Sequence, residues 1–237
     1  MFEYRGLQDM FFMALYGVAA FFALLACVYL LCRRGNAFAD DVGSSRTLRR
    51  WTAAFMAAVV ASHVWWYVIG IYWLSDDWLV RTITVIMLDH STLVPLVMGV
   101  LLALLQDRRR RLWPWLVAQM PVVAAGIAGI ARHSWFWGSE MAHYWQLAVV
   151  TAFVVYYIRA LRQYGRWLLD NSADLERKEV WQSLVFAVAL FVFYEIYTSN
   201  AGEMTKEYLA QVITIVIIAF LLWRVETLQE LEDGDQT

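Results

Sequence analysis

Long apolar runs recur along this 237-residue chain, and they constrain its fold more than any other feature. Each run is about 20 residues long, the length that an α-helix needs to cross about 30 Å of hydrocarbon. Hydrophobic residues make up 61% of the chain, against about 45–50% in an ordinary soluble domain. A spanning segment must satisfy its own backbone hydrogen bonds, so the runs predict an all-α polytopic membrane protein.

Polar interruptions divide the chain into seven predicted spans that form one seven-transmembrane-helix bundle. The spans are 10–31, 51–74, 82–105, 112–131, 143–161, 179–199 and 207–223. We expect the first span to be retained, because it is too long for a cleaved signal peptide and lacks a basic n-region and a small-residue cleavage site. The predicted organisation is a transmembrane domain over 1–224 and a short acidic cytoplasmic tail over 225–237.

The distribution of basic residues predicts the orientation of the bundle. Fifteen of the 19 Lys and Arg residues lie in the first, third and fifth loops, at the ends of the spans beside them, or in the tail. Because short loops rich in Lys and Arg stay cytoplasmic, we predict an external N-terminus and a cytoplasmic C-terminus in a multi-pass protein of the cell (inner) membrane. The net charge of −2 gives no bulk basic character, so direct nucleic-acid binding is not expected.

An acid and an imidazole stand side by side within the third span, at Asp89 and His90. A charged side chain at the centre of a bilayer costs roughly 2.5–3.5 kcal/mol, so such groups normally face the bundle interior and indicate a functional site. His63 lies near mid-membrane, and the sixth span ends outward. We therefore predict an outward-opening cavity with apolar walls and a few convergent polar groups. The candidate ligand-binding residues are His63, Trp66, Asp89, His90, Tyr194 and Glu195.

These residues also have structural interpretations. His63 and Asp89 can hydrogen-bond between helices, each contributing less than about 1 kcal/mol. Asp89 and His90 point about 100° apart on a helix, so they need not act together. Glu195 is close enough to the interface to snorkel, and outer tryptophans such as Trp66 are typical of packing and of interfacial belts.

The histidines and acids complete no catalytic, metal or chromophore set. The last span has no lysine for retinal and no histidine for the zinc set of seven-span hydrolases, which His63 and Asp89 match only in part. Of the histidines, only His63 and His90 are deep enough for haem, and their depths differ. Cys27 and Cys32 have neither disulfide nor zinc spacing. We expect no cofactor and no metal, and we favour a function other than enzymatic catalysis.

The predicted fifth loop, 162–178, is the most distinctive polar stretch. Over 164–183, charges of both signs alternate with tryptophan and leucine, which is typical of an amphipathic interfacial helix leading into the sixth span. The candidate residues for coupling a signal are Arg166, Trp167, Asp174 and Trp181. The alternative interpretation is a solvated connecting loop.

Three stretches on the predicted cytoplasmic side carry a resemblance to a known group. They are RRGNAFA at 33–39 with LRRWTAAF at 48–55, LQDRRR at 105–110, and the stretch 164–183. Here the chain resembles the seven-helix sensor regions that bacteria place ahead of cytoplasmic output domains of the AraC or histidine-kinase type. Members continue into an output domain, whereas this chain ends at Thr237. We therefore expect a truncated sensor, or one that signals through a separate partner.

The resemblance and the intramembrane polar groups together predict a bacterial receptor domain that binds a small ligand from the outer side and signals inward. The alternatives are a membrane enzyme or a metal- or haem-binding protein built on His63, Asp89 and His90, and a structural subunit of a larger membrane complex. The expected partners are the lipid bilayer, a small molecule, a cytoplasmic output domain, kinase or transcription regulator, and a second copy of the chain in a homodimer.

Overall fold

The computed structural model describes residues 7–33, 45–69, 76–105, 110–171, 181–190, 192 and 203–228. Every regular element in these ranges is a helix, so the predicted all-α class is confirmed. The elements in chain order are α1 (Leu7–Cys32), α2 (Arg46–Tyr67), α3 (Trp78–Ala103), α4 (Trp113–Val117), α5 (Met120–Ala131), the π-helical turn η2 (Phe136–Glu140), α6 (Met141–Asn171), the helix Trp181–Leu190, and α8 (Glu203–Thr227).

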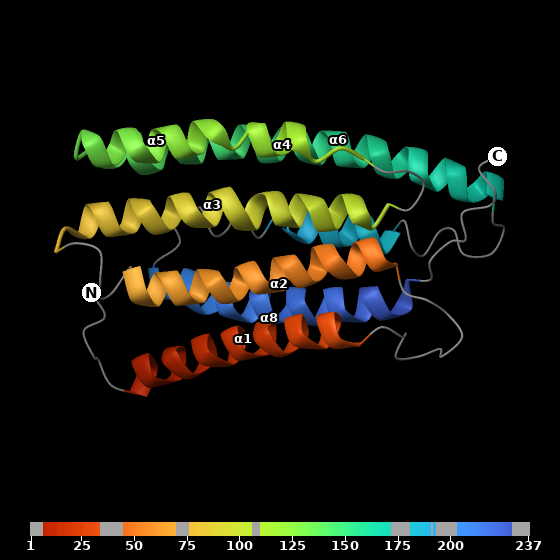
Figure 1. Cartoon of the computed structure of the whole chain (residues 1–237), viewed down its shortest axis with the longest axis horizontal. Helices are drawn as coiled ribbons and strands as arrows, with labels where there is room; N and C mark the ends of the chain where they lie inside the picture. The colour runs from red at the N-terminus through yellow and green to blue at the C-terminus, as the bar shows by residue number, and fades with distance from the viewer. Residues whose placement is uncertain are drawn as a thin grey trace.

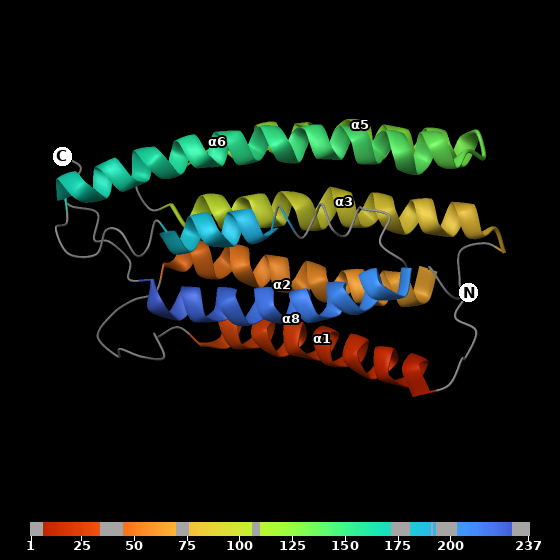
Figure 2. The same ribbon diagram turned by 180° about the vertical axis from the view of Figure 1, so that it is seen from behind.

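The long helices run side by side along one axis (Figures 1 and 2). α1 packs on α2 and α8, α2 packs on α3, and α3 packs on α5 and α6. α1, α2 and α3 alternate in direction, whereas α4 and α5 follow one another in line (Figure 1). α2, α3 and α8 occupy the middle of the bundle, where they can present side chains to a common interior (Figure 2).

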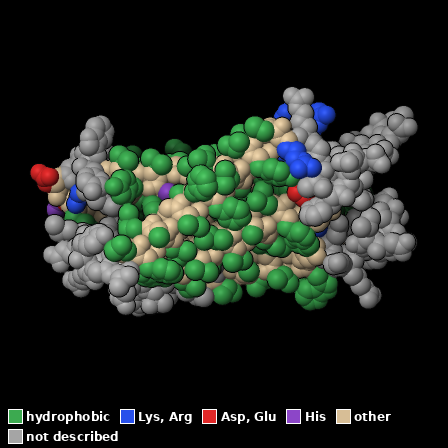
Figure 3. Space-filling model, turned by 90° about the horizontal axis from the view of Figure 1, so that it is seen from below, with side chains coloured by type: hydrophobic (Ala, Val, Ile, Leu, Met, Phe, Trp, Pro, Cys, Tyr) green, Lys and Arg blue, Asp and Glu red, His purple; other side chains and the backbone are tan. Residues whose placement is uncertain are grey.

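Among the described residues, five helices are long and apolar enough to cross a membrane: Met10–Cys32, Trp78–Ala103, Trp113–Ala131, Phe136–Trp167 and Glu207–Thr227. Each overlaps a predicted span. α2 is long enough but begins with the basic residues Arg46, Arg49 and Arg50, and Trp181–Leu190 is shorter. In the space-filling view, apolar side chains cover the middle of the visible face and charged ones gather towards its ends (Figure 3). This is the surface expected of a membrane protein.

Two loops expected from their polar composition are largely helical. α6 continues through the predicted loop start to Asn171, because Tyr164 is 0% exposed and its ring stacks on that of Trp167 with centroids 6.0 Å apart. Between the predicted fourth and fifth spans, a tight turn at 132–134, in which His133 has a φ of 49°, leads through Trp135 directly into η2. Buried aromatic contacts thus extend α6 into the predicted fifth loop, and a single left-handed residue makes the connection before η2 short.

Two boundaries also differ from the prediction. The fourth span is broken at Ala118 and Gln119 into α4 and α5. Pro121 explains the break, because its ring clashes with the carbonyl four residues earlier and it has no N–H to donate. At the other end of the chain, α8 reaches Thr227, and Glu226 is only 5% exposed, so the helix includes the first residues assigned to the acidic tail.

Glycines allow the closest helix approaches. A Cβ atom on Gly129 would lie 2.2 Å from the Gly138 Cα atom, so α5 and η2 meet at a distance that only glycine permits. A Cβ atom on Gly99 would lie 2.6 Å from the Trp51 ring, where α3 crosses α2. Small residues at such crossings are typical of membrane helices, because they bring backbones into van der Waals contact.

Candidate functional site

A cavity of about 310 Å³ lies at the centre of the bundle. Its size is at the lower end of the range for ligand sites, about 300–1,000 Å³. Side chains from six described helices line it: α1, α2, α3, α6, Trp181–Leu190 and α8. Four of the six predicted ligand-binding residues lie in its wall, namely His63, Trp66, Asp89 and His90. Tyr194 and Glu195 are outside the described residues.

Asp89 is held by two neighbouring tryptophans of α2. The Trp65 indole N–H donates to Asp89 Oδ1 at 2.8 Å, and the Trp66 indole N–H donates to Oδ2 at 2.6 Å. The Ser62 side chain approaches the same carboxyl group. His63 and His90, the two histidines predicted near this carboxyl, hydrogen-bond to other groups in the structure.

The packing of α2 on α3 brings these three side chains together. Trp65 and Trp66 lie in the last turn of α2, whereas Asp89 lies near the middle of α3, eleven residues after Trp78.

His63 links three helices. Its Nδ1 donates to the Val59 carbonyl at 2.8 Å, since a carbonyl can only accept, and its Nε2 lies 3.0 Å from Gln211 Oε1 on α8. When the ring is neutral, Nε2 is the acceptor and the Gln211 amide turns its NH₂ group towards it. From α1, Tyr16 packs its ring 4.5 Å from the imidazole and donates its hydroxyl to the His63 carbonyl at 2.6 Å. His63 thus supports the wall of the cavity.

His90 directs one ring nitrogen to its own helix. Its Nδ1 donates to the Ile86 carbonyl at 2.8 Å, and the ring lines the cavity. In the neutral imidazole the other nitrogen, Nε2, is then a hydrogen-bond acceptor. No second hydrogen bond to this ring is present within the part of the chain that the structure describes. His90 can therefore accept a hydrogen bond from a bound molecule.

The predicted coupling residues lie apart from the cavity. Trp167 packs on Tyr164 within α6, and Arg166 beside it is exposed. Trp181 begins the short helix Trp181–Leu190 and is 63% exposed. Asp174 is outside the described residues. None of the three described residues lines the central cavity.

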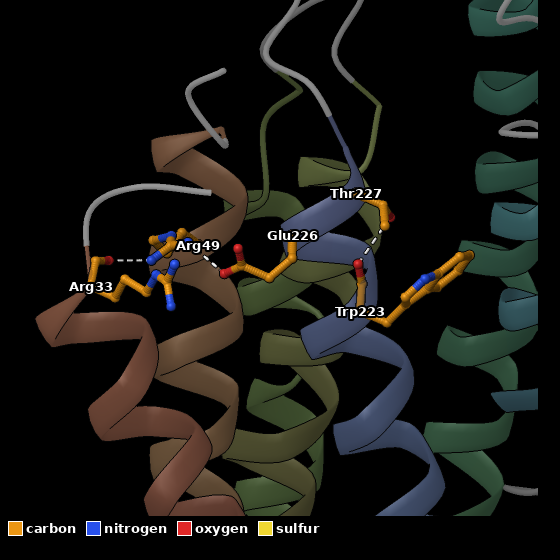
Figure 4. Close-up of polar contacts among 5 residues, drawn as sticks. All are labelled: Arg33, Arg49, Trp223, Glu226 and Thr227. Carbon is orange, nitrogen blue, oxygen red and sulfur yellow. Dashed lines mark hydrogen bonds and ion pairs between the residues drawn. The ribbon is translucent and has the colours of Figure 1, made fainter. Parts of the chain in front are cut away.

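A second buried polar contact, not predicted from the sequence, lies at the end of the bundle formed by the start of α2 and the end of α8 (Figure 4). Arg49 Nη2 lies 2.7 Å from Glu226 Oε1, with the two side chains 9% and 6% exposed. Arg49 Nη1 also donates to the Arg33 carbonyl at the end of α1. One guanidinium thus ties three helices together. The sequence signal was weak, because the two charged partners are 177 residues apart.

Tyr16 lines the cavity from α1, and Gln211 and Thr214 line it from α8, although none of the three is among the predicted ligand-binding residues. Within the described ranges, no group of three or more His, Cys, Asp and Glu side chains is arranged to share a metal ion. Comparison of the chain with protein families, with characterised proteins and with solved structures gives no match.

Proposed function

We propose that this chain is a membrane-embedded receptor domain that binds a small ligand in the central cavity and transmits a signal to a cytoplasmic output domain or partner. The supporting observation is the convergence of His63, Trp66, Asp89 and His90 on one cavity inside a bundle of apolar helices. A mostly apolar pocket with a few converging polar groups is the usual form of a small-molecule site. An ionisable group at this depth is costly, and its retention is best explained by use.

α8 provides a route for the signal. Gln211 contacts His63 at the cavity, and Glu226 on the same helix pairs with Arg49. The two residues are 15 positions apart, which is about 22 Å along a helix. A ligand can shift an equilibrium only by its differential affinity for two states. We propose that ligand contact with the His63–Gln211 pair favours one position of α8, and that the Arg49–Glu226 pair favours the other.

The proposal includes seven spans with the C-terminus in the cytoplasm. Arg33, Arg49, Arg110 and Arg224, which flank the predicted cytoplasmic ends of four spans, support this orientation through the preference of short basic loops for the cytoplasm. In this orientation the Asp89 end of the cavity is nearer the outside, and the Arg49–Glu226 pair lies on the side where an output domain would act.

Binding and transmission can be tested separately on the purified protein. A thermal-shift screen of small polar, cationic and amphiphilic compounds should yield binders of the wild type that an Asp89→Asn, His90→Gln double variant binds more weakly. Asp77→Asn is a matched control, because this acid lies outside the cavity. If the compounds bind the wild type and the double variant with equal affinity, the central cavity is not the ligand site.

Transmission is measured with spin labels at the exposed residues Arg162 and Trp223, changed to cysteine in a Cys32→Ser background. A receptor should change the distance between α6 and the end of α8 when a binder is added. If binders occupy the cavity and leave this distance unchanged, the chain is a binding protein that does not signal through α8.

A further inference from the structure

The polar and apolar side chains of the central cavity are separated along its length. On α3, Asp89 and His90 lie at one end of the lining, and the residues that follow, from Leu93 to Leu101, are apolar. Asp89 and Leu101 are 12 positions apart, which is about 18 Å along the helix. The cavity wall on α3 therefore begins with an acid and continues as a long apolar strip.

The neighbouring helices repeat this separation in the same direction. On α2, which is antiparallel to α3, the polar lining residues Ser62 and His63 come after the apolar Phe55 and Val59. On α8, Gln211 and Thr214 precede Ile217. The lining residues of α6 and of Trp181–Leu190 are all apolar: Val150, Phe153, Val154, Ala187 and Leu190. The polar groups thus form a head compartment, defined by Ser62, His63, Asp89, His90 and Gln211, and the rest forms an apolar channel.

The head compartment offers mainly hydrogen-bond acceptors. The two indole donors that reach it are both used by Asp89. The imidazole N–H groups of His63 and His90 are used by backbone carbonyls of their own helices, which leaves His90 Nε2 as an acceptor. A ligand head placed here must therefore donate hydrogen bonds.

The charge of the compartment favours a cation. Asp89 is its acid, and no Lys or Arg is found among the described residues that line the cavity. A carboxylate in an apolar bundle is normally paired with an opposite charge. The Trp66 ring, which also lines the cavity, adds a surface that attracts cations.

We propose that the ligand is a cationic amphiphile, with a protonated amine head at Asp89 and His90 and an alkyl chain in the apolar channel towards Leu101. This inference rests on the proposed function, because it assigns a chemical class to the ligand of the same cavity. A head with one positive charge and two or three N–H donors satisfies both Asp89 and His90. The alkyl chain of the ligand buries its apolar surface against the apolar channel. A small amine without an alkyl chain would leave this channel empty.

A series of probes with one chain and different heads tests the head. Dodecylamine, dodecanol and dodecanoate are titrated against the protein in nanodiscs of zwitterionic lipid, with tryptophan fluorescence as the readout and empty nanodiscs as the blank for partitioning. We expect dodecylamine to bind at least about tenfold more tightly than dodecanol, because its hydrogen bonds to Asp89 are charge-assisted, and dodecanoate to bind most weakly. Asp89→Asn should remove the preference for the amine, and the control Asp77→Asn should retain it.

Shortening the probe and narrowing the channel test the tail. Butylamine should bind at least about tenfold more weakly than dodecylamine, because burying each CH₂ group contributes about 0.8 kcal/mol. Leu101→Trp, which leaves the head compartment intact, should weaken dodecylamine and leave butylamine unchanged.

Three outcomes would overturn the inference. Equal binding of dodecylamine and dodecanol would assign the cavity to neutral donors, and equal loss in Asp77→Asn and Asp89→Asn would place the amine outside the cavity. Failure of all three dodecyl probes to bind would reject the amphiphile. In each case the proposed receptor function is tested separately, by the compounds found in the thermal-shift screen and by the distance change at α8.

Discussion

Replacing Glu226 by Gln should destabilise the bundle strongly, because it leaves the Arg49 guanidinium buried without its counter-charge. The two side chains are 9% and 6% exposed and 2.7 Å apart. Removing one partner of a buried ion pair costs about 3–5 kcal/mol. Arg49 keeps its bond to the Arg33 carbonyl, so we expect the lower value. At about 2–4 °C per kcal/mol for a chain of this size, a loss of about 3 kcal/mol lowers Tm by about 6–12 °C.

The assay is thermal unfolding of the purified protein in detergent, with Arg50→Gln as the control, because Arg50 is the exposed neighbour of Arg49. The double variant Arg49→Met, Glu226→Leu removes both charges and replaces them with apolar groups, so it should recover most of the lost stability. The reasoning is refuted if Glu226→Gln lowers Tm no more than Arg50→Gln, or if the double variant is less stable than Glu226→Gln.

Four further predictions follow. Gly129→Val should cost about 1–3 kcal/mol through overpacking, because a Cβ atom at Gly129 meets Gly138 backbone, whereas Gly17→Val, with nothing within 4 Å, should have a much smaller effect on Tm. Asp89→Asn should lower stability by about 1 kcal/mol, since both indole donors lose charge-assisted bonds; an unchanged Tm would contradict this. A reporter fused after Thr237 should be cytoplasmic and one inserted within 135–140 should be external, and the reverse result would overturn the orientation. Elemental analysis and an absorbance scan of purified protein should show no stoichiometric metal or haem, whereas one tightly bound metal per chain would favour the enzyme or metal-protein alternative.

The five long apolar helices could be predicted because hydrophobic length alone defines them. The ends were harder, because they depend on contacts rather than composition. Arg162 and Arg166 make the predicted fifth loop polar, and yet α6 continues to Asn171 because buried Tyr164 packs on Trp167. Pro121 was visible in the sequence, but whether a proline bends a helix or breaks it depends on local packing: Pro95 remains inside α3.

The composition of the candidate site could be predicted in part for a different reason. In antiparallel spans, the depth of a residue follows from its distance to the nearest loop, so His63, Trp66, Asp89 and His90 could be assigned to neighbouring levels of the bundle. The partner of each polar atom could not be assigned, because that requires the rotation of each helix about its axis. Asp89 therefore bonds to Trp65 and Trp66 instead of a histidine.

Rotation also explains how the cavity and the Arg49–Glu226 pair are related. Gln211 contacts His63 from one face of α8. Glu226 lies 15 residues further along the same helix, close to four complete turns of about 3.6 residues. Gln211 and Glu226 therefore point to nearly the same side, towards α2, and each bonds to a residue of α2. Because α8 is one continuous helix, a rotation that separates Gln211 from His63 also moves Glu226 relative to Arg49. A rigid rotation of α8 would therefore change both polar contacts together, as the proposed receptor function requires.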